Sequence, residues 1–481
     1  MRILFIYKDI NLNGPFGILS LSAALRAAGH ETGLALVERK GFLARVQDFK
    51  PDVLAYSLTT GFHRYYLEIN HQLRAELARN GRRVLSLFGG PHATFFPEMI
   101  ETDGVDMICR GEGEDAIVDL ADTLRHGGDY SRIHNLWIKS GDSIIKNDVR
   151  PLIADLDCIP FPDRDLLYGQ DRFMRDSPMK IFFPNRGCPY ICTYCFNHKY
   201  NELYRGKGEV VRYRSVDNVL AEIKDVRSKY PLKFIFFLSD NFILSRDWVS
   251  EFAERYPKEI GLPFTCNIRA NLLDAAVASD LKKAGCLSVI FGVESGNERV
   301  RNDILKRQMS DEVILHAGSL LRARGIRMYT QNILALPGES FPQALSTLAL
   351  NQRLRPSYAW ASIFTPYPSN ELTEYAVKNG FFDGNTDQVN YSFHAHSVMR
   401  FASRRERRMF TNLHRLFGIM VEWPVLGRRA RALCAIPLTP VYSLLYKLWY
   451  GYTNRYRIYS YPMSFREYLL GVIRFFRKDS S

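Results

Sequence analysis

The chain lacks a long uninterrupted apolar segment. Nowhere in its 481 residues do about 18 uncharged apolar residues follow one another, the length that a membrane-spanning helix needs. The amino-terminal apolar run ends at Tyr7, ahead of Lys8 and Asp9, and is too short for the hydrophobic region of a signal peptide. These absences argue against a membrane-spanning protein and lead us to expect a cytoplasmic one.

Cysteine is also scarce, with eight residues in the whole chain. Three of them fall within eight positions, and the others are scattered: Cys109, Cys158, Cys266, Cys286 and Cys434. This usage favours a reducing compartment with one metal site over a disulfide framework.

Acidic residues are rare in the last part of the chain. Residues 401–481 hold 15 Lys and Arg against 4 Asp and Glu, a net charge of +11, so the preceding 400 residues carry only +2 of the total of +13. The basic character of the protein therefore belongs to its carboxyl-terminal segment.

Strand-like and helix-like patterns alternate along residues 1–150. The expected strands are Arg2–Tyr7, Val53–Ser57, Val84–Phe88 and Asp106–Cys109, and the expected helices are Ile18–Ala28, His63–Asn80 and Glu114–Arg125. Such alternation with short glycine-containing turns predicts an α/β domain with a doubly wound parallel sheet, Rossmann-like and flavodoxin-like.

A second alternating series occupies residues 179–375, after a Pro- and Asp-rich linker at 151–178. Six strands are expected, at Lys180–Pro184, Phe234–Ser239, Phe264–Ile268, Ser288–Val293, Met328–Leu336 and Trp360–Thr365, with helices between them. This pattern predicts a partial (β/α)6 TIM barrel whose chemistry lies at the carboxyl ends of its strands. The alternation is then lost, and 376–481 is expected to be a basic, aromatic, helical region.

The three clustered cysteines directly follow the first expected barrel strand. Cys188, Cys192 and Cys195 stand in the segment NRGCPYICTYCFN, which begins where the apolar stretch IFFP ends. Thiolates are the ligands of iron–sulfur clusters. A four-iron cube has four corners, so three cysteines would leave one iron open to a small chelating molecule.

Two other metal sites compete with this interpretation. Structural zinc takes four ligands, and His198 could supply the fourth. A closed electron-transfer cluster would need a fourth cysteine, for which the scattered cysteines offer no motif. A non-catalytic protein that uses the cysteines as a structural or redox site is therefore the alternative from a different class.

The spacing Cys-x3-Cys-x2-Cys, with an aromatic residue before the last cysteine, resembles the signature of the radical S-adenosylmethionine (SAM) superfamily. The resemblance implies a [4Fe-4S] cluster whose open iron is chelated by the amino and carboxylate groups of SAM. It also implies reductive cleavage of SAM to a 5′-deoxyadenosyl radical, which abstracts a hydrogen atom from an unactivated carbon. The electron would come from a reductant such as flavodoxin or ferredoxin.

The same resemblance assigns cofactor-binding roles near the ends of the expected strands. Tyr194 is expected to lie against adenine, and Arg269 and Glu294 are expected to touch the SAM carboxylate or the ribose hydroxyls. Asp240 is expected to face the site, and the turn that holds Gly338 is expected to pack against adenine. Each of these residues could instead be a helix cap or part of a salt bridge at the barrel rim.

The amino-terminal domain resembles the cobalamin (B12)-binding domain of mutases and methionine synthase. Asn11 follows the expected strand Arg2–Tyr7, Ser57 and Thr59 lie at the end of the expected strand Val53–Ser57, and Gly89 and Gly90 follow the expected strand Val84–Phe88. Small residues at strand ends let a bulky nucleotide tail enter the crevice of the sheet. Asn11 stands where those proteins carry the cobalt-binding histidine. Either cobalamin binds without an imidazole from this loop, or the domain has kept its fold and lost the cofactor.

Together the two halves resemble the class of radical SAM enzymes with an amino-terminal B12-binding domain. We expect methylation of an unactivated carbon, in which one SAM supplies the radical and a second methylates cobalamin. Radical cyclisation or rearrangement without methyl transfer is the alternative within the class.

The basic segment 401–481 is rich in aromatic residues, including Trp423 and Trp449. Mixed basic and aromatic character suits the interface of an anionic membrane, which would favour a lipid-like substrate over another small molecule. The alternative is a helical lid whose apolar face packs on the barrel. Ser464 and Glu467 have the spacing of a capping box. Nucleic acid is not expected as a partner, because no recognised binding fold accompanies the charge.

Overall fold

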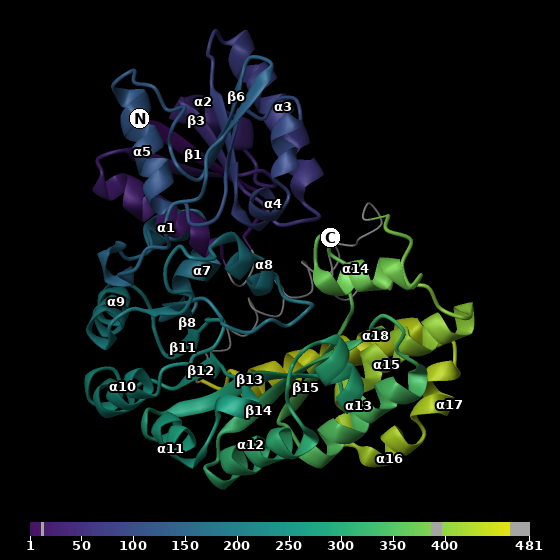
Figure 1. The fold of residues 1–481 in the computed structure, drawn as a ribbon. Coiled ribbons are helices and arrows are strands. Elements are labelled where there is room, and N and C mark those ends of the chain that lie inside the picture. Colours follow the sequence, from purple (N-terminus) through teal and green to yellow (C-terminus); the bar gives the residue numbers. More distant parts are fainter. Residues whose placement is uncertain (11–13, 386–396, 462–481) are drawn as a thin grey trace. The chain divides into compact units, whose positions relative to one another are not determined.

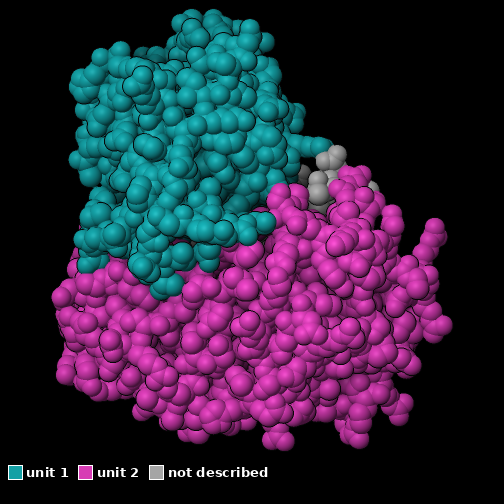
Figure 2. Space-filling model, viewed as in Figure 1, with its two compact units in different colours: residues 1–176, 199–212 teal, residues 177–198, 213–481 magenta. Residues whose placement is uncertain are grey.

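The computed structural model describes residues 1–10, 14–385 and 397–461 and divides the chain into two compact units (Figure 1). Unit 1 comprises Met1–Asp176 and Lys199–Arg212, and unit 2 comprises Ser177–His198 and Tyr213–Ser481 (Figure 2). Asn11 and the expected capping box at Ser464 and Glu467 lie outside the described residues.

A seven-stranded sheet in the order β2-β1-β3-β4-β5-β6-β7 forms the centre of unit 1. The first five strands are parallel, and β6 and β7 are antiparallel to their neighbours. The order β2-β1-β3-β4-β5 is the flavodoxin-like one, which confirms the predicted fold class. The strands are β1 (Arg2–Tyr7), β2 (Glu31–Leu36), β3 (Val53–Ser57), β4 (Leu85–Gly89), β5 (Met107–Cys109), β6 (Leu136–Ser140) and β7 (Ser143–Lys146).

The helices of unit 1 connect these strands and share a core with them. Leu54 and Phe88, both fully buried, belong to a cluster that also includes Leu73 from α3. The helical elements are α1 (Phe16–Ala27), α2 (Phe42–Phe49), α3 (His63–Arg79), α4 (Gly90–Phe95), η1 (Pro97–Glu101) and α5 (Glu114–Arg125).

The segment expected to be a linker contains short helical turns that pack on unit 1. Asp163 accepts hydrogen bonds from Ser22 Oγ at 2.7 Å and Arg26 Nη1 at 3.1 Å, both on α1. Leu167 and Tyr168 are buried. The turns are η2 (Leu156–Cys158), α6 (Arg164–Tyr168) and α7 (Arg172–Asp176). This part of the chain is thus fixed to the first unit by ion pairing and by burial.

Unit 2 contains a six-stranded, fully parallel sheet in the order β15-β14-β13-β12-β11-β8, as predicted for a partial barrel. The strands are β8 (Met179–Phe182), β11 (Phe234–Phe237), β12 (Phe264–Asn267), β13 (Cys286–Glu294), β14 (Arg327–Leu334) and β15 (Tyr358–Ile363). Two further short strands are β9 (Asn185–Arg186) and β10 (Arg212–Tyr213). α8 (Phe196–Leu203) begins in unit 2 and ends in unit 1. The other connecting helical elements are α9 (Val216–Lys229), α10 (Arg246–Glu259), η3 (Ala270–Leu272), α11 (Ala275–Lys283), η4 (Val300–Ile304), α12 (Asp311–Ala323), α13 (Phe341–Leu354) and α14 (Glu371–Lys378).

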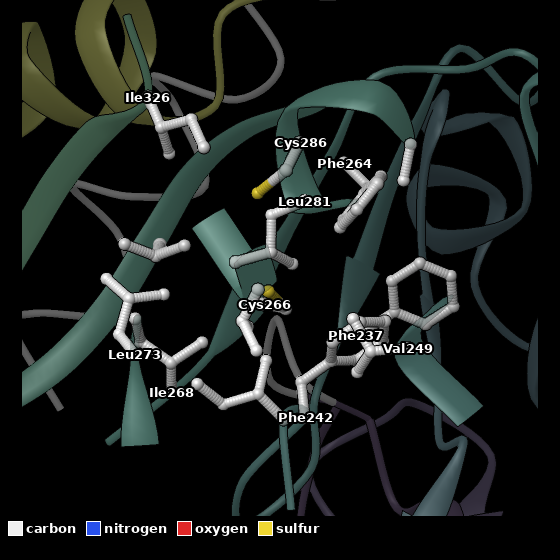
Figure 3. Packing of buried hydrophobic residues seen from close by; sticks show 14 of the residues in the cluster. Phe237, Phe242, Val249, Phe264, Cys266, Ile268, Leu273, Leu281, Cys286 and Ile326 are labelled. Atoms are coloured by element: carbon white, nitrogen blue, oxygen red, sulfur yellow. The ribbon is translucent and has the colours of Figure 1, made fainter. Parts of the chain in front are cut away.

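An aromatic and aliphatic core lies between this sheet and its helices (Figure 3). Phe237 and Phe264 pack edge to face, with ring centroids 5.3 Å apart. Cys266 and Cys286, two of the scattered cysteines, are fully buried in this cluster. They are part of the hydrophobic core, away from water, where free cysteine commonly lies.

The carboxyl-terminal helices pack on the flank and the amino-terminal end of the barrel. Phe417 of α15 joins a core cluster with Ala359 of β15, and Arg327 at the start of β14 donates to the carbonyl of Arg457 at 2.8 Å. The elements are α15 (Arg404–Glu422), α16 (Pro424–Arg428), α17 (Ala430–Ala435), α18 (Thr439–Thr453) and η6 (Asn454–Ile458). No helix in the described part of the chain has the length and apolar character needed to cross a bilayer.

Candidate functional site

The cysteine loop lies between β9 and α8, past the carboxyl end of β8. Thr193 anchors it, since its amide donates to Leu305 O at 3.3 Å and its hydroxyl donates to Ile304 O at 2.7 Å. Cys195 closes a turn by donating its amide to Cys192 O at 3.0 Å. These bonds hold the three thiols in one loop at the active end of the barrel.

Burial dominates the electrostatics of these thiols. It raises the pKa of Cys195 to about 12 and also raises the pKa of Cys188, and the neighbouring cysteines and Asp240 add to both shifts. Metal ligation needs thiolates, so binding of a metal cluster here releases protons.

Arg269, just beyond β12, supplies a positive charge to this loop. Its Nη1 donates to Cys192 Sγ at 3.4 Å, Nε donates to Asn271 Oδ1 at 2.8 Å, and Nη2 bonds to the carbonyl of Arg307. The guanidinium lies 3.7 Å from the ring centroid of Tyr190. It therefore supports the cysteine loop directly, a contact beyond the SAM contact that we expected.

Tyr194, Glu294 and Arg307 form a buried network next to the cysteines. The Tyr194 hydroxyl donates to Glu294 Oε1 at 3.0 Å and accepts from Arg307 Nη1 at 2.7 Å. Arg307 Nη1 also lies 3.6 Å from Glu294 Oε1. Burial raises the pKa of Glu294, and Arg307 and Tyr194 partly offset this shift. The network fixes a polar carboxylate at the strand ends, where an amine or hydroxyl could be bound.

A bulge at the end of β13 sets the direction of Glu294. The register with β14 shifts between Gly292 and Glu294, and Glu294 has a φ of 63°, a left-handed conformation that costs a non-glycine residue free energy. A Cβ on Gly292 would lie 1.8 Å from Glu294 Oε1. Strain of this kind is typical of functional positions, and here it turns the carboxylate back over its own strand.

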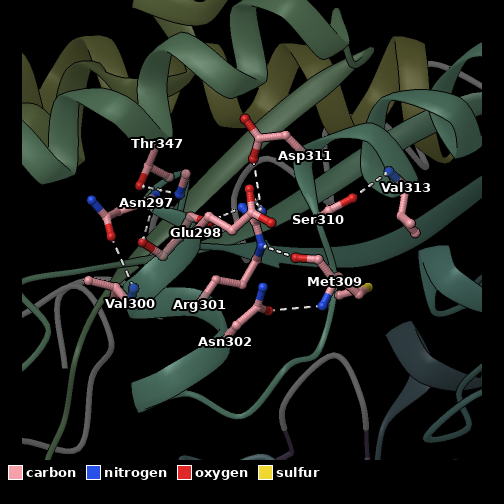
Figure 4. Close-up of polar contacts among 12 residues, drawn as sticks. Asn297, Glu298, Val300, Arg301, Asn302, Met309, Ser310, Asp311, Val313 and Thr347 are labelled. Carbon is pink, nitrogen blue, oxygen red and sulfur yellow. Dashed lines mark hydrogen bonds and ion pairs between the residues drawn. The ribbon is translucent and has the colours of Figure 1, made fainter.

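Arg301 fixes the loop that follows this bulge (Figure 4). Its fully buried guanidinium donates to Ser295 O, Met309 O and Asp311 Oδ1, each at 2.8 Å. Arg301 therefore bonds to residues on both sides of the segment that carries Arg307. A buried arginine whose groups are bonded in this way holds one loop geometry.

The predicted turn around Gly338 follows β14. Gly338 has a φ of 75°, and a Cβ there would lie 2.8 Å from the Phe381 ring. Glu339 is buried, and its Oε2 accepts from the amide of Leu336 at 3.2 Å, while its Oε1 has no partner among the described residues. Burial raises the pKa of Glu339 to about 8. Leu336 belongs to a hydrophobic cluster against which Tyr194 packs.

Asp240 and His198 lie at the margin of the cysteine loop. Asp240 is exposed and accepts from Asn197 Nδ2 at 2.9 Å. His198 Nε2 lies 3.9 Å from Glu371 Oε2. Across the ranges that the structure describes, no three or more His, Cys, Asp and Glu side chains are grouped to hold a metal ion.

In unit 1 the predicted small residues meet at the carboxyl edge of the sheet. The Leu58 amide donates to Gly89 O at 2.9 Å, and a Cβ on Gly90 would lie 2.8 Å from Leu58 N, so only glycine fits there. The hydroxyls of Ser57 and Thr59 have no hydrogen-bond partner in the described part of the chain. Ser57 ends β3 and Thr59 follows it, next to β1, where the strand order reverses and such sheets bind ligands.

A pair of histidines borders this edge. The rings of His63 and His92 stack with centroids 4.2 Å apart, and Thr60 Oγ1 lies 3.2 Å from His92 Nδ1. Burial lowers the pKa of His92 to about 3, so its ring is neutral at physiological pH. His63 was not among the predicted cofactor-binding residues.

The donor chemistry of both sites fits the implied cofactors. Three thiols with an adjacent guanidinium suit an iron–sulfur cluster. The carboxylate of Glu294 suits the polar groups of SAM. The unbonded hydroxyls and the glycine pair of unit 1 suit a nucleotide tail. Sequence reasoning missed Arg307 and Arg301, which lie outside the strand ends and reach the site only through the fold. Glu339 belongs to the predicted turn after β14 but was given no role of its own.

Comparison with known proteins supports both of the family resemblances. Residues 182–350 match the model of the radical SAM superfamily, and residues 11–121 match the model of the B12 binding domain. An uncharacterized methyltransferase of Pyrococcus horikoshii is 30% identical over 342 residues, which cover 69% of this chain and 71% of that protein.

Two further similarities extend over more of the chain. The anaerobic magnesium-protoporphyrin IX monomethyl ester cyclase of Cereibacter sphaeroides is 24% identical over 404 residues, covering 77% of this chain and 63% of that protein. The solved structure of the cobalamin-dependent SAM radical enzyme OxsB, with aqua-cobalamin and SAM bound, has a TM-score of 0.66. It is 16% identical and covers all of this chain and 75% of its own. At this identity the likeness shows the fold.

Both family models match this one chain, and the Pyrococcus horikoshii protein is 30% identical to it over 342 residues. Together with the cysteine loop of the barrel, these matches assign the family. The chain belongs to the radical SAM superfamily of enzymes, in the class with an amino-terminal B12-binding domain.

Proposed function

We propose that this enzyme transfers a methyl group to an unactivated carbon of a small molecule. When bound, the cluster and SAM supply a 5′-deoxyadenosyl radical that removes a hydrogen atom, and cobalamin supplies the methyl group. The electron comes from a protein donor such as flavodoxin or ferredoxin. The observation that carries the proposal is the presence of a radical SAM cysteine loop and a B12-binding crevice in one chain.

The residues of the barrel bind and orient SAM in this proposal. Cys188, Cys192 and Cys195 hold the cluster, and Arg269 stabilises the Cys192 sulfur through its hydrogen bond. Glu294 accepts from polar hydrogens of SAM, and the cluster of Leu336 and its neighbours excludes water beside Tyr194. In this proposal Asp240 lies at the rim of the site, and the turn that holds Gly338 packs against adenine.

The residues of unit 1 bind cobalamin. Ser57 and Thr59 donate their unbonded hydroxyls to the nucleotide tail, and Gly89 and Gly90 keep the crevice free of side chains. Asn11, which stands where related proteins carry a histidine, would supply no imidazole to cobalt.

The test uses the full chain, purified without oxygen, reconstituted with iron and sulfide and incubated with SAM, reductant and hydroxocobalamin. We expect 5′-deoxyadenosine and S-adenosylhomocysteine, the first from radical formation and the second from methylation of cobalamin. Cys192→Ala should abolish 5′-deoxyadenosine. Cys158→Ala is the matched control, because this exposed cysteine lies outside the loop.

The outcomes separate the alternatives. 5′-Deoxyadenosine without S-adenosylhomocysteine, from protein that retains cobalamin, would replace methyl transfer by cyclisation or rearrangement. A colourless, air-stable protein that binds zinc would replace the enzyme by a structural metal protein.

A further inference from the structure

The outer side of α18 exposes apolar side chains to solvent, where a surface helix normally carries polar ones. Val441, Leu444, Leu445, Leu448 and Tyr452 recur at i, i+3, i+4, i+7 and i+11, which places them on one side of the helix, and each is 42–54% exposed. We call this set the α18 face.

The inner side of the same helix carries tyrosines instead. Tyr446 accepts from Trp360 Nε1 at 3.0 Å, and its ring lies 5.5 Å from that of His414 on α15. Tyr442 is buried and donates to Leu433 O at 3.1 Å. The orientation of α18 is thus fixed by polar contacts to β15 and to α17, and its aliphatic residues are left pointing outward.

Aromatic rings extend the α18 face toward α16. Trp423 and Trp449 lie 5.0 Å apart, Trp449 and Tyr452 lie 5.7 Å apart, and Tyr452 and Tyr456 lie 5.3 Å apart, between ring centroids. Of the sixteen exposed large hydrophobic side chains in the described residues, eleven fall between Trp423 and Tyr456. The exposure is therefore concentrated in one segment rather than scattered, which marks an interaction site.

The charge of this segment has one sign. Between residues 423 and 461 there are six Lys and Arg and no Asp or Glu. Arg428, Arg429 and Arg431 are exposed, and their guanidinium groups make no hydrogen bond or ion pair within the described ranges. Arg428 ends α16, and Arg429 and Arg431 follow it ahead of the exposed residues that lead into α18. Free arginines beside exposed leucine, tryptophan and tyrosine complement an anionic lipid surface.

We propose that the α18 face, together with Arg428, Arg429 and Arg431, binds the surface of an anionic membrane. The leucines enter the boundary of headgroups and acyl chains, tryptophan and tyrosine lie at headgroup depth, and the arginines contact lipid phosphates. This inference concerns where the enzyme acts and does not depend on which group it transfers.

The test is flotation of the full chain with vesicles of equal parts phosphatidylglycerol and phosphatidylcholine, compared with phosphatidylcholine alone. We expect binding to the anionic vesicles and at least tenfold weaker binding to the neutral ones. The Leu444→Ser, Leu448→Ser double variant should bind at least tenfold more weakly. The Leu43→Ser, Val377→Ser control changes side chains of similar exposure elsewhere and should bind as the wild type does.

A second variant tests the charge. Arg428→Gln, Arg429→Gln and Arg431→Gln together should weaken binding about 100-fold, because each basic residue near an anionic surface contributes about a factor of five. Unchanged melting temperatures show that all variants are folded, since the substituted side chains are exposed.

Three outcomes overturn the proposal. Vesicle binding that both variants retain would remove the surface from consideration. Concentration-dependent dimerisation without vesicle binding, abolished by Leu444→Ser, Leu448→Ser, would assign the face to a second copy of the chain. Binding that appears only after deletion of residues 462–481 would assign the face to that segment.

Discussion

At the scale of single residues, Arg307 joins the parts of the candidate SAM site. It donates to Tyr194 and to Gly292 O at 2.5 Å, and its own carbonyl accepts from Arg269. Although burial lowers the pKa of Arg307, Tyr194 and Glu294 raise it above its ordinary value. The charge is therefore permanent, and the flat fork of the guanidinium sets two acceptors in one geometry. We assign Arg307 as a positioning residue.

Arg307→Lys should weaken SAM binding about 10-fold to 100-fold, because lysine keeps the charge but loses the fork, and a hydrogen bond to a charged group is worth about 1.5–3 kcal/mol. The measurement is SAM affinity, read from the change that SAM causes in the electron paramagnetic resonance spectrum of the reduced cluster. Arg324→Lys, directly after α12, is the control and should bind SAM normally. A merely structural role would lower the melting temperature and leave SAM affinity intact.

Glu339 makes the stability of the barrel depend on pH. Its pKa is about 8 in the folded protein and lies at 4.5 in an exposed glutamate. Between these values the folded carboxyl keeps a proton that the unfolded chain has released, so the contribution of Glu339 to stability is largest below pH 4.5 and falls as pH rises toward 8.

Glu339→Gln should remove this loss, because glutamine does not titrate. Between pH 5 and pH 8 the free energy of unfolding of the wild type should fall by about 4 kcal/mol more than that of the variant. The difference in melting temperature between the two proteins at each pH follows this change. Glu312→Gln, at an exposed carboxyl whose pKa is lowered, should leave the loss in place. If melting temperature depended on pH equally in the wild type and in Glu339→Gln, Glu339 would be ionised in the folded state over this pH range.

At the scale of elements, the loop after β13 depends on close approach to α13. A Cβ on Gly296 would lie 2.2 Å from Ser346 O and 2.5 Å from Thr347 Cα, and both are backbone atoms of a helix that cannot rotate away. The amide of Gly296 also donates to Thr347 Oγ1 at 2.8 Å. This contact ties the position of Glu294 to the helix behind the sheet.

Gly296→Ala should lower the free energy of unfolding by about 1–3 kcal/mol, the usual cost of overpacking, and should weaken SAM binding because Glu294 moves with the loop. Thermal unfolding and SAM titration measure the two effects. Gly451→Ala within α18 is the control, since its Cβ meets nothing and alanine favours a helix. A Gly296→Ala protein as stable as the wild type would mean that α13 shifts to make room.

The sequence predicted the parallel sheets because their buried strands are continuous apolar runs between glycine-containing turns. It missed β2, whose first residues Glu31 and Thr32 are polar, and the antiparallel hairpin of β6 and β7, which follows no helix. It predicted Cys192, Tyr194, Arg269 and Glu294 as site residues, since strand ends and cysteine spacing can be read locally. In the structure Tyr194 bonds to Glu294, and Arg269 bonds to Cys192. Arg307 could not be found this way. It lies in a charged loop and reaches Tyr194, 113 positions earlier, only after folding.

At the scale of the whole molecule, each unit has a hydrophobic core of its own. The core of unit 1 surrounds β1, β3 and β4, and those of unit 2 surround the barrel strands and α15. A substitution on the exposed edge of one sheet therefore leaves the packing of the other unit unchanged. Cobalamin binding and SAM cleavage should accordingly be separable by single substitutions.

Thr59→Trp should separate them. Thr59 is exposed at the carboxyl end of β3, and its hydroxyl is unbonded among the described residues, so an indole there should block the crevice without disturbing a core. We expect cobalamin retained after desalting to fall at least tenfold and S-adenosylhomocysteine to disappear, while 5′-deoxyadenosine still forms in the barrel. Gln72→Trp, on the exposed side of α3, is the control and should keep both products. Cobalamin retained at the wild-type ratio would remove the nucleotide tail from this edge. Loss of 5′-deoxyadenosine together with cobalamin would show that SAM cleavage needs the loaded B12 domain, and the two chemistries would then act as one.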